Sequence, residues 1–441
     1  MCKHGINYYI KELLKISAPI ILGNIGFILI GIGDVVVAGR HSTDTFAAIS
    51  IATAILNCIF TFGIGLISSI SPLLSNYRGE KRVVKKYFYP SIRFAMTLAF
   101  IVSILIFAFI PVIPYMGFEQ KLIKPIQEYM FITAFSTFGA YLHACLKEFL
   151  QTFEIVMFPN VLTLFCVFLN VALNIIFVFG FGPIPSMGVI GLAIASLLVR
   201  YVMGLSLLGY CYMQMRLSNY HEKGYYKSLV KIGLPISMAV FVEFVAFNCI
   251  AILMGRVAGI YAAAQNLICS LTTVSFMVPF AISNAIAIKV GFANGAGEFQ
   301  DLKKYAMTGT AMSVLFMMCS AVVFLSFPKV IVGIFTVDNN IYKIVLPIMI
   351  VVAIFQVFDG LQVSLAGICK GIKQTDIVLF ANFLAYWCVS IPVGCILGLV
   401  LNYKLIGFWI GLVLAAMILC TIMIYKLKKF YNNLKLTMAQ K

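Results

Sequence analysis

Long apolar runs constrain the fold of this chain more than any other feature. Each run is about 20 residues long and continuous rather than alternating, which is the pattern of a membrane-spanning helix. Lipid cannot hydrogen-bond to the backbone, so these segments must satisfy their own polar groups. We therefore predict an all-α polytopic membrane protein. Its twelve transmembrane helices are expected at about 14–38, 46–74, 90–113, 125–146, 156–180, 187–210, 232–254, 261–288, 305–327, 343–367, 377–400 and 405–425.

The composition of the 441 residues supports a membrane protein, since 62% are hydrophobic and only 11% are charged. The formal net charge of +17 comes mainly from segments between the apolar runs, such as 78–86. These basic segments fall in alternate connections, which places both termini in the cytoplasm and requires an even number of spans. We expect membrane lipids to contact the chain, no nucleic-acid partner, and a monomer.

The chain contains an internal repeat. Lys15-Ile-Ser-Ala-Pro19 recurs as Lys231-Ile-Gly-Leu-Pro235, and Ala38-Gly39-Arg40 aligns with Met254-Gly255-Arg256 at the same offset of 216 residues. Because six spans are an even number, both halves should have the same orientation, related by a pseudo-two-fold axis along the membrane normal.

This repeat predicts two homologous six-helix bundles, which should form a V-shaped molecule with a central cavity. The predicted domains are an N-terminal bundle at 1–212, a cytoplasmic linker at 213–231, a C-terminal bundle at 232–425 and a basic cytoplasmic tail at 426–441.

Three acidic residues lie inside apolar runs: Asp34, Glu243 and Asp359. A charged side chain at that depth costs about 2.5–3.5 kcal/mol on insertion scales and therefore suggests a function. Burial disfavours the charged form of a carboxyl group, so such a residue tends to take up a proton or a cation. We expect all three to couple cation binding to transport, with H⁺ or Na⁺ at Glu243 and Asp359. At offset 216, Asp34 aligns with Ile250 and Glu243 with Phe27, so the acids are not repeated with the fold.

Polar and aromatic residues surround the two acids of the second half. Gln356, Asp359 and Gln362 follow an i, i+3, i+6 spacing and should share one helical face. Glu243 is flanked by phenylalanines, which indicates a cavity for flat lipophilic molecules. The predicted site also includes, as cation or substrate ligands, Gln265, Gln356 and Gln362, and, as cavity aromatics, Phe244, Phe247, Phe358 and Tyr386.

Two interpretations of Asp34 remain open. It could form a structural salt bridge with Arg40 near the outer end of its span. It could instead belong to a cation or proton site with Asn170 and Asn174, whose i, i+4 spacing presents two amides on one helical face.

The basic and nucleophilic residues indicate no catalytic site. Lys147 is assigned to the cytoplasmic side, Arg200 is expected to extend to the cytoplasmic surface, and His143 is expected to be a hydrogen-bonded packing residue. The chain has no Walker A sequence, so ATP is not expected to supply energy. We predict no enzyme activity and no cofactor other than the coupling ion.

These residues resemble those of the multidrug and toxic compound extrusion (MATE) family, in particular its bacterial NorM-like branch. The resemblance covers essentially the whole chain. The segments that carry it include GIGDVVVAGRHSTDTFAAISIA (31–52), LNVALNIIFVFGFGPIPSMGVIGLAIAS (169–196), VEFVAFNCIAILMGRVAGIYAAAQN (242–266), SNAIAIKVGFANGAGEFQDLKKYA (283–306), FQVFDGLQVSLAGICKGIKQTD (355–376) and AYWCVSIPVGCILG (385–398). The chain departs from the family pattern where Ala264 replaces a His, Lys289 an Arg, and Asn174 the fifth-span Asp of the archaeal type.

The resemblance implies a secondary active antiporter of the bacterial inner membrane. It would export organic cations and other amphipathic compounds in exchange for H⁺ or Na⁺ by alternating access.

The nearest alternative is a lipid-linked oligosaccharide flippase of the same superfamily, which should place basic residues in its cavity to bind pyrophosphate. A membrane-embedded enzyme would need a cluster of catalytic groups, and a gated channel would conduct without ion coupling.

Overall fold

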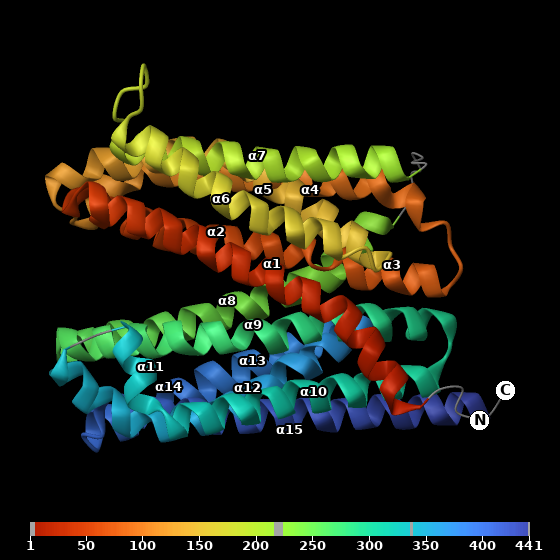
Figure 1. Ribbon diagram of the computed structural model, residues 1–441. Coiled ribbons are helices and arrows are strands. Elements are labelled where there is room, and N and C mark those ends of the chain that lie inside the picture. Colours follow the sequence, from red (N-terminus) through yellow and green to blue (C-terminus); the bar gives the residue numbers. More distant parts are fainter. Residues whose placement is uncertain (1–4, 216–223, 336–337, 440–441) are drawn as a thin grey trace. The chain divides into compact units, whose positions relative to one another are not determined.

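The computed structural model describes residues 5–215, 224–335 and 338–439, and these are almost entirely helical (Figure 1). The elements of the first half are α1 (Ile6–His41), α2 (Thr43–Ile67), α3 (Ile70–Gly79), η1 (Val84–Tyr87), α4 (Phe88–Phe109), η2 (Ile110–Met116), α5 (Gln120–Thr152), α6 (Met157–Phe179) and α7 (Gly188–Gln214). Those of the second half are α8 (Tyr225–Val257), α9 (Gly259–Ala296), α10 (Phe299–Ser326), α11 (Pro328–Phe335), α12 (Asn339–Gly371), α13 (Thr375–Phe383), η3 (Leu384–Ser390), α14 (Ile391–Cys395), η4 (Ile396–Val400) and α15 (Lys404–Ala439).

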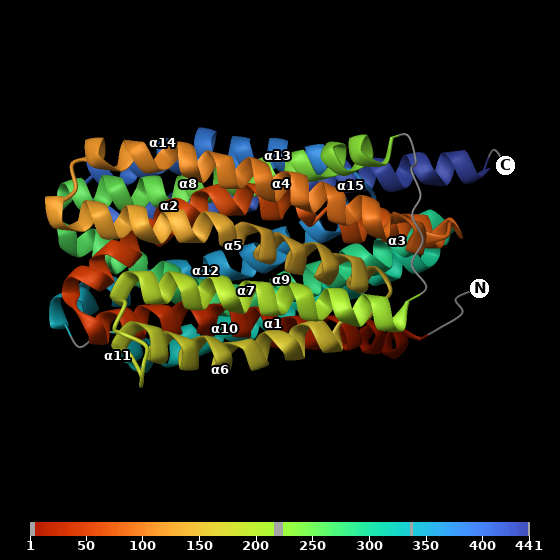
Figure 2. The ribbon, with the colours of Figure 1, turned by 90° about the horizontal axis from the view of Figure 1, so that it is seen from above.

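The described residues form 12 helices long and apolar enough to cross a membrane, which confirms the predicted number. Most of these helices are longer than the predicted runs; the first, for example, covers Ile6–His41 and the eighth Gly259–Ala296. Figure 2 shows the same helices running lengthwise when viewed from above. The chain is therefore a multi-pass, all-α membrane protein.

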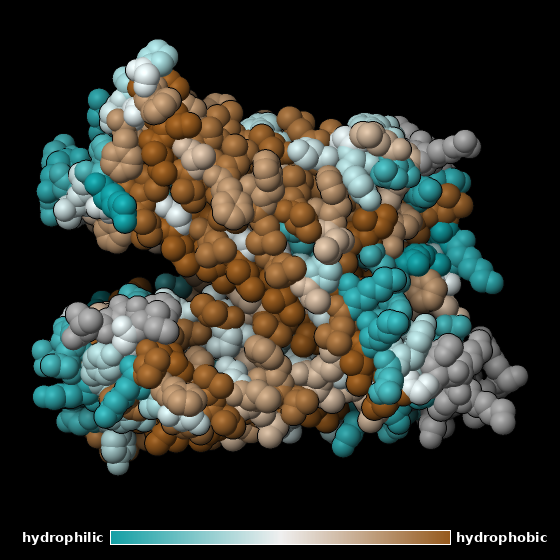
Figure 3. All heavy atoms as spheres, in the orientation of Figure 1, coloured by the Kyte–Doolittle hydropathy of each residue, from teal (hydrophilic) through white to brown (hydrophobic). Residues whose placement is uncertain are grey.

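The surface shows why these helices suit a membrane. Apolar side chains cover the middle of the helices on the visible face, and hydrophilic side chains gather at their two ends (Figure 3). Many large hydrophobic side chains are exposed, including Phe168 at 76% and Phe165 at 62% on α6. Exposed apolar surface of this kind is stable in contact with lipid tails rather than water.

The internal contacts divide the chain into two compact units. The first helix of each repeat, α1 or α8, contributes residues to both units. One unit comprises Ala18–Ser237, and the other comprises Met1–Ser17 together with Met238–Lys441. The divisions fall next to Pro19 in α1 and Pro235 in α8, which lie inside their helices and are equivalent in the repeat. A proline inside a helix removes a backbone hydrogen bond and favours a change of direction.

The boundaries of these packing units thus differ from those of the predicted domains, because the predicted domains were defined by the sequence repeat and not by contacts. Of the predicted linker 213–231, residues 216–223 lie outside the described part of the chain, and 225–231 form the start of α8. In the predicted tail 426–441, α15 continues without a break to Ala439, and the last two residues lie outside the described part.

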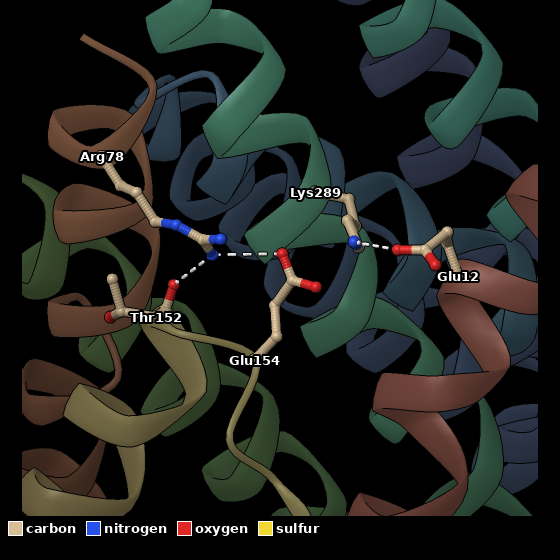
Figure 4. Close-up of polar contacts among 5 residues, drawn as sticks. All are labelled: Glu12, Arg78, Thr152, Glu154 and Lys289. Atoms are coloured by element: carbon tan, nitrogen blue, oxygen red, sulfur yellow. Dashed lines mark hydrogen bonds and ion pairs between the residues drawn. The ribbon is translucent and has the colours of Figure 1, made fainter. Parts of the chain in front are cut away.

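In the Ala18–Ser237 unit, α5 occupies the centre and packs against α2, α4 and α7. At the end of α5, the Arg78 guanidinium donates hydrogen bonds to the Thr152 carbonyl at 3.0 Å and to Glu154 Oε1 at 3.1 Å (Figure 4). These bonds join the end of α3 to the turn between α5 and α6.

In the other unit, α12 is central and packs against α9, α10 and α15. The first turns of α1 are held there by an ion pair, because Lys289 Nζ on α9 lies 2.5 Å from Glu12 Oε2 (Figure 4). The side chain of Lys289 is only 8% exposed, and that of Glu12 is 22% exposed. The Tyr9 hydroxyl also donates to Asp301 at 2.5 Å, which adds a second polar anchor on α10.

We expect Lys289→Met to lower the thermal unfolding temperature of the purified chain in detergent. The substitution leaves the partly buried Glu12 carboxylate without its partner, at a cost of about 1–3 kcal/mol. The matched control is Lys303→Met, since Lys303 is an exposed lysine near the start of α10. Adding Glu12→Gln to Lys289→Met should recover part of the loss; equal unfolding temperatures for all variants would contradict the anchoring role.

Candidate cation-binding site

Two predicted acids meet in the unit that contains most of the second half. Glu243 lies on α8, and Asp359 and Gln362 lie one turn apart on α12. The Gln362 amide nitrogen donates to Asp359 Oδ1 at 2.9 Å and lies 3.4 Å from Glu243 Oε1. One side-chain amide therefore bridges the two carboxylates.

The other hydrogen-bond partners of Glu243 come from a third span, Thr375–Val400. The Tyr386 hydroxyl donates to Glu243 Oε1 at 2.8 Å, and Asn382 Nδ2 lies 3.5 Å from Glu243 Oε2. Asn382 Nδ2 also donates to the Ala239 carbonyl at 3.3 Å, one turn earlier on α8. Because Asn382 and Tyr386 are four residues apart, both face α8 from the same side.

The backbone around Tyr386 is irregular. Residues Leu384–Ser390 (η3) form a π-helical turn between the α-helical segments α13 and α14. Such turns are rare and occur frequently at functional sites, because the wider turn changes the direction of nearby side chains. Here it begins two residues after Asn382 and carries Tyr386, which donates to Glu243.

The site has the composition of a binding site for a proton or a hard monovalent cation. Asp359 and Gln362 are 6% and 5% exposed, and Gln362 Oε1 is a buried oxygen without a hydrogen-bond partner in the described part of the chain. Two carboxylates in a low-dielectric environment repel each other until a proton or a cation neutralises one of them. Carboxylate, hydroxyl and amide oxygens are the ligands that hard cations prefer. Within the described residues, no group of three or more His, Cys, Asp and Glu side chains could hold a metal ion.

An aromatic cluster adjoins this site, although not all of the predicted aromatic residues belong to it. The Phe247 ring lies 6.0 Å from the Tyr386 ring, 6.2 Å from Phe355 and 6.5 Å from Trp409. Phe244 and Phe358 are partly exposed. Trp409 and Phe355 were not predicted, because they are apolar residues within apolar helices and nothing in their spacing distinguishes them.

The remaining glutamines of the prediction have other partners. Gln265 Oε1 accepts a hydrogen bond from Trp409 Nε1 at 2.9 Å, which places it on the far side of the aromatic cluster. Gln356 Oε1 accepts from Ser320 on α10 at 2.7 Å. Both side chains therefore support the surroundings of the site rather than contacting Glu243 or Asp359.

Asp34 has its own polar site in the Ala18–Ser237 unit. Asn174 Nδ2 donates to Asp34 Oδ1 at 2.7 Å and lies 3.1 Å from Asn170 Oδ1. Ser196 Oγ on α7 donates to Asp34 Oδ2 at 3.2 Å. The predicted grouping of these two asparagines with Asp34 is thus present in the structure, and Ser196 is a partner that the sequence analysis missed.

The alternative salt bridge between Asp34 and Arg40 does not form in the described residues. Arg40 is exposed at the end of α1, and neither residue takes part in an ion pair. They are six residues apart, which places their side chains on different faces of α1.

Arg200 and His143 of the same unit differ from expectation. Arg200 does not extend to the surface: its Nη1 donates to Ser136 Oγ at 2.7 Å, and its guanidinium lies 5.0 Å from the centre of the Phe60 ring. His143 is 3% exposed, and its Nε2 has no hydrogen-bond partner among the described residues. Lys147 is only partly exposed, within α5. The membrane-spanning helices thus contain more partly buried basic groups than the sequence indicated.

The family model described as MatE matches residues 19–176 and 235–396. A Bacillus subtilis (strain 168) protein named "Probable multidrug resistance protein NorM" is 26% identical over 424 residues, which are 92% of this chain and 92% of that protein. "Multidrug resistance protein NorM" of Aliivibrio fischeri (strain ATCC 700601 / ES114) is 26% identical over 427 residues, 93% of this chain and 92% of its own.

A crystal structure of the Vibrio cholerae MATE transporter VcmN superposes with a TM-score of 0.90 at 16% sequence identity. The superposition covers 97% of this chain and 98% of that structure. At this identity the similarity establishes a common fold and not a common substrate.

We expect Tyr386→Phe to destabilise the purified chain, because Glu243 then loses its shortest hydrogen bond. A hydrogen bond to a charged group is worth about 1.5–3 kcal/mol, so the thermal unfolding temperature should fall by several degrees. Tyr115→Phe is the control, since Tyr115 is 89% exposed. In a double-mutant cycle with Glu243→Gln, the two effects should not add; strict additivity would show that the hydrogen bond contributes nothing.

Proposed function

We propose that this chain, which belongs to the MatE family, is a secondary active antiporter that exports organic cations and other amphipathic compounds in exchange for H⁺ or Na⁺. The observation that carries the proposal is the pair of carboxylates on α8 and α12 bridged by the Gln362 amide. Its location would be the bacterial inner membrane, with both termini in the cytoplasm. The names of the relatives agree with multidrug export.

The chemistry of the site supports exchange between ion and drug. Glu243 and Asp359 together carry up to two negative charges, which a proton, Na⁺ or an organic cation can each neutralise. The aromatic cluster of Phe247, Phe355, Tyr386 and Trp409 adds ring faces, which attract organic cations. Competition for the same two carboxylates would make binding of the ion and binding of the drug mutually exclusive.

Coupling follows if the two states of the transporter differ in their affinity for the ion. A ligand shifts a conformational equilibrium only by its difference in affinity for the two states. Glu243, Asp359 and Tyr386 come from three different spans, so loss of one hydrogen bond between them changes the packing energy of those helices. In the outward state the ion would bind Glu243 and Asp359 and displace the drug, with a second ion site at Asp34.

A lipid-linked oligosaccharide flippase is a second candidate function. It is favoured by the partly buried Arg200 and Lys147 in the Ala18–Ser237 unit, since a pyrophosphate substrate requires basic partners. The two functions differ in their dependence on an ion gradient and in their substrate, so one reconstituted system can separate them.

The test is ethidium efflux from proteoliposomes under an imposed pH gradient or an imposed Na⁺ gradient, applied separately. We expect the double variant Glu243→Gln and Asp359→Asn to lose gradient-driven efflux, because no carboxylate then remains to exchange ion for drug. The isosteric amides preserve the volume of the site, and Glu298→Gln, which changes a carboxylate just before α10, serves as the control. Full coupled efflux by the double variant would refute the proposal.

A further inference from the structure

The repeat can be followed into the spans that carry the second acid. Lys147 with Gln151-Thr152 at the end of α5 recurs, at an offset of 223 residues, as Lys370 near the end of α12 with Gln374-Thr375 at the start of α13. At this offset Ser136 occupies the position of Asp359. At the offset of 216, Phe27 occupies the position of Glu243. Both acids of the second half are therefore replaced by uncharged residues in the first half.

The structure shows one pair of contacts at positions that match in the repeat. In one unit, Asn382 donates to the carbonyl of Ala239. In the other unit, Asn160 lies against Gly23 so closely that a side chain at Gly23 would overlap the Asn160 amide. Gly23 aligns with Ala239, and Asn160 aligns with Asn382 at an offset of 222. The same contact is thus made by matching residues of each half.

Basic groups contact Phe27 and Ser136, the residues of the first half that align with the two acids. The ammonium group of Lys147 lies 5.4 Å from the centre of the Phe27 ring, and the His143 ring lies 5.6 Å from it. His143 and Lys147 are one turn apart on α5 and share a face. Arg200 donates to Ser136, the counterpart of Asp359. At matching positions of the repeat, the second half thus has acidic side chains, whereas the first half has uncharged side chains in contact with basic groups.

Neither basic group forms a salt bridge within the described part of the chain; the carboxylates that act on them electrostatically are Asp34 for Arg200 and Glu148 for Lys147. No carboxylate lies within 4 Å of Lys147 or Arg200. Two polar atoms of this unit are also unpaired, since His143 Nε2 and Asn24 Nδ2 are buried without a hydrogen-bond partner among the described residues. Asn24 lies three residues before Phe27, on the same side of α1. Buried polar groups usually have a hydrogen-bond partner. An unpartnered His143 one turn from the Lys147 ammonium therefore indicates that a ligand is missing.

We propose that Lys147, His143, Asn24 and Phe27 form an anion-accepting site for the carboxylate or phosphate group of an amphipathic substrate. Lys147 Nζ and Asn24 Nδ2 supply hydrogen-bond donors, and Lys147 supplies the opposite charge. Phe27 is 44% exposed and offers an aromatic face to the apolar part of the same molecule. The inference rests on the proposed export function and assigns to named residues the place where an acidic group of such a substrate binds.

The test is equilibrium binding to the purified full-length chain in detergent, without any ion gradient. The probe is dansylglycine, a fluorescent carboxylate, and its uncharged counterpart is dansylglycinamide. We expect the wild type to bind the carboxylate at least tenfold more tightly than the amide. Lys147→Met should abolish this preference, and Lys147→Arg, which keeps the charge, should retain most of it.

Lys124→Met is the matched control, because Lys124 lies on the same helix with its side chain 84% exposed. It should bind both probes as the wild type does. Equal binding of the two probes by the wild type, or an unchanged preference in correctly folded Lys147→Met, would overturn the site. Because no gradient is applied, this outcome is separate from a failure of ion-coupled efflux.

A second arm distinguishes the sources of the acidic group. Mixed micelles containing phosphatidylglycerol compete with dansylglycine if the site accepts a lipid phosphate, whereas micelles of phosphatidylcholine alone provide the reference. Displacement by the anionic lipid assigns the site to a lipid headgroup. Absence of displacement, with the carboxylate preference intact, assigns it to a small molecule.

Discussion

Inside a membrane, a polar group must find its partner within the protein, and this requirement determines the organisation of both halves of the molecule. The backbone meets it by forming helices throughout the described spans. Side chains satisfy this requirement through hydrogen bonds between helices. Gln362 and Tyr386 donate to Glu243, and Asn174 and Ser196 donate to Asp34. Each buried acid is thus also a point at which separate helices are joined, so a change in its charge alters helix packing.

The sequence was sufficient to predict the helices and to single out the acids within them, and the reason is physical. Hydrophobic length identifies a span without knowledge of its neighbours, and a carboxylate in such a span is conspicuous for its cost. The spacing of Asp359 and Gln362 also predicted that the two side chains lie on one face of a helix. Each of these signals is local, which is why each could be read from one segment of the chain.

Other parts of the site depend on contacts between distant segments. Asn382 and Ser196 are ordinary polar residues in sequence, and only packing brings them to Glu243 and Asp34. Gln356 shows the limit of a spacing argument. A step of three residues turns the helix about 60° short of a full circle, so Gln356 and Gln362 diverge by about 120°. Gln356 therefore faces Ser320 on α10 while Gln362 faces α8.

The division of α1 between the two units has a consequence for synthesis of the chain. Tyr9 and Glu12, in the segment Ile6–Ser17, leave the ribosome well before their partners Asp301 and Lys289, which are made some 280 residues later. Until α9 and α10 are in place, this segment has no native surface to dock on. This segment is therefore among the last parts of the described chain to reach its final position, and the ion pair forms late in folding.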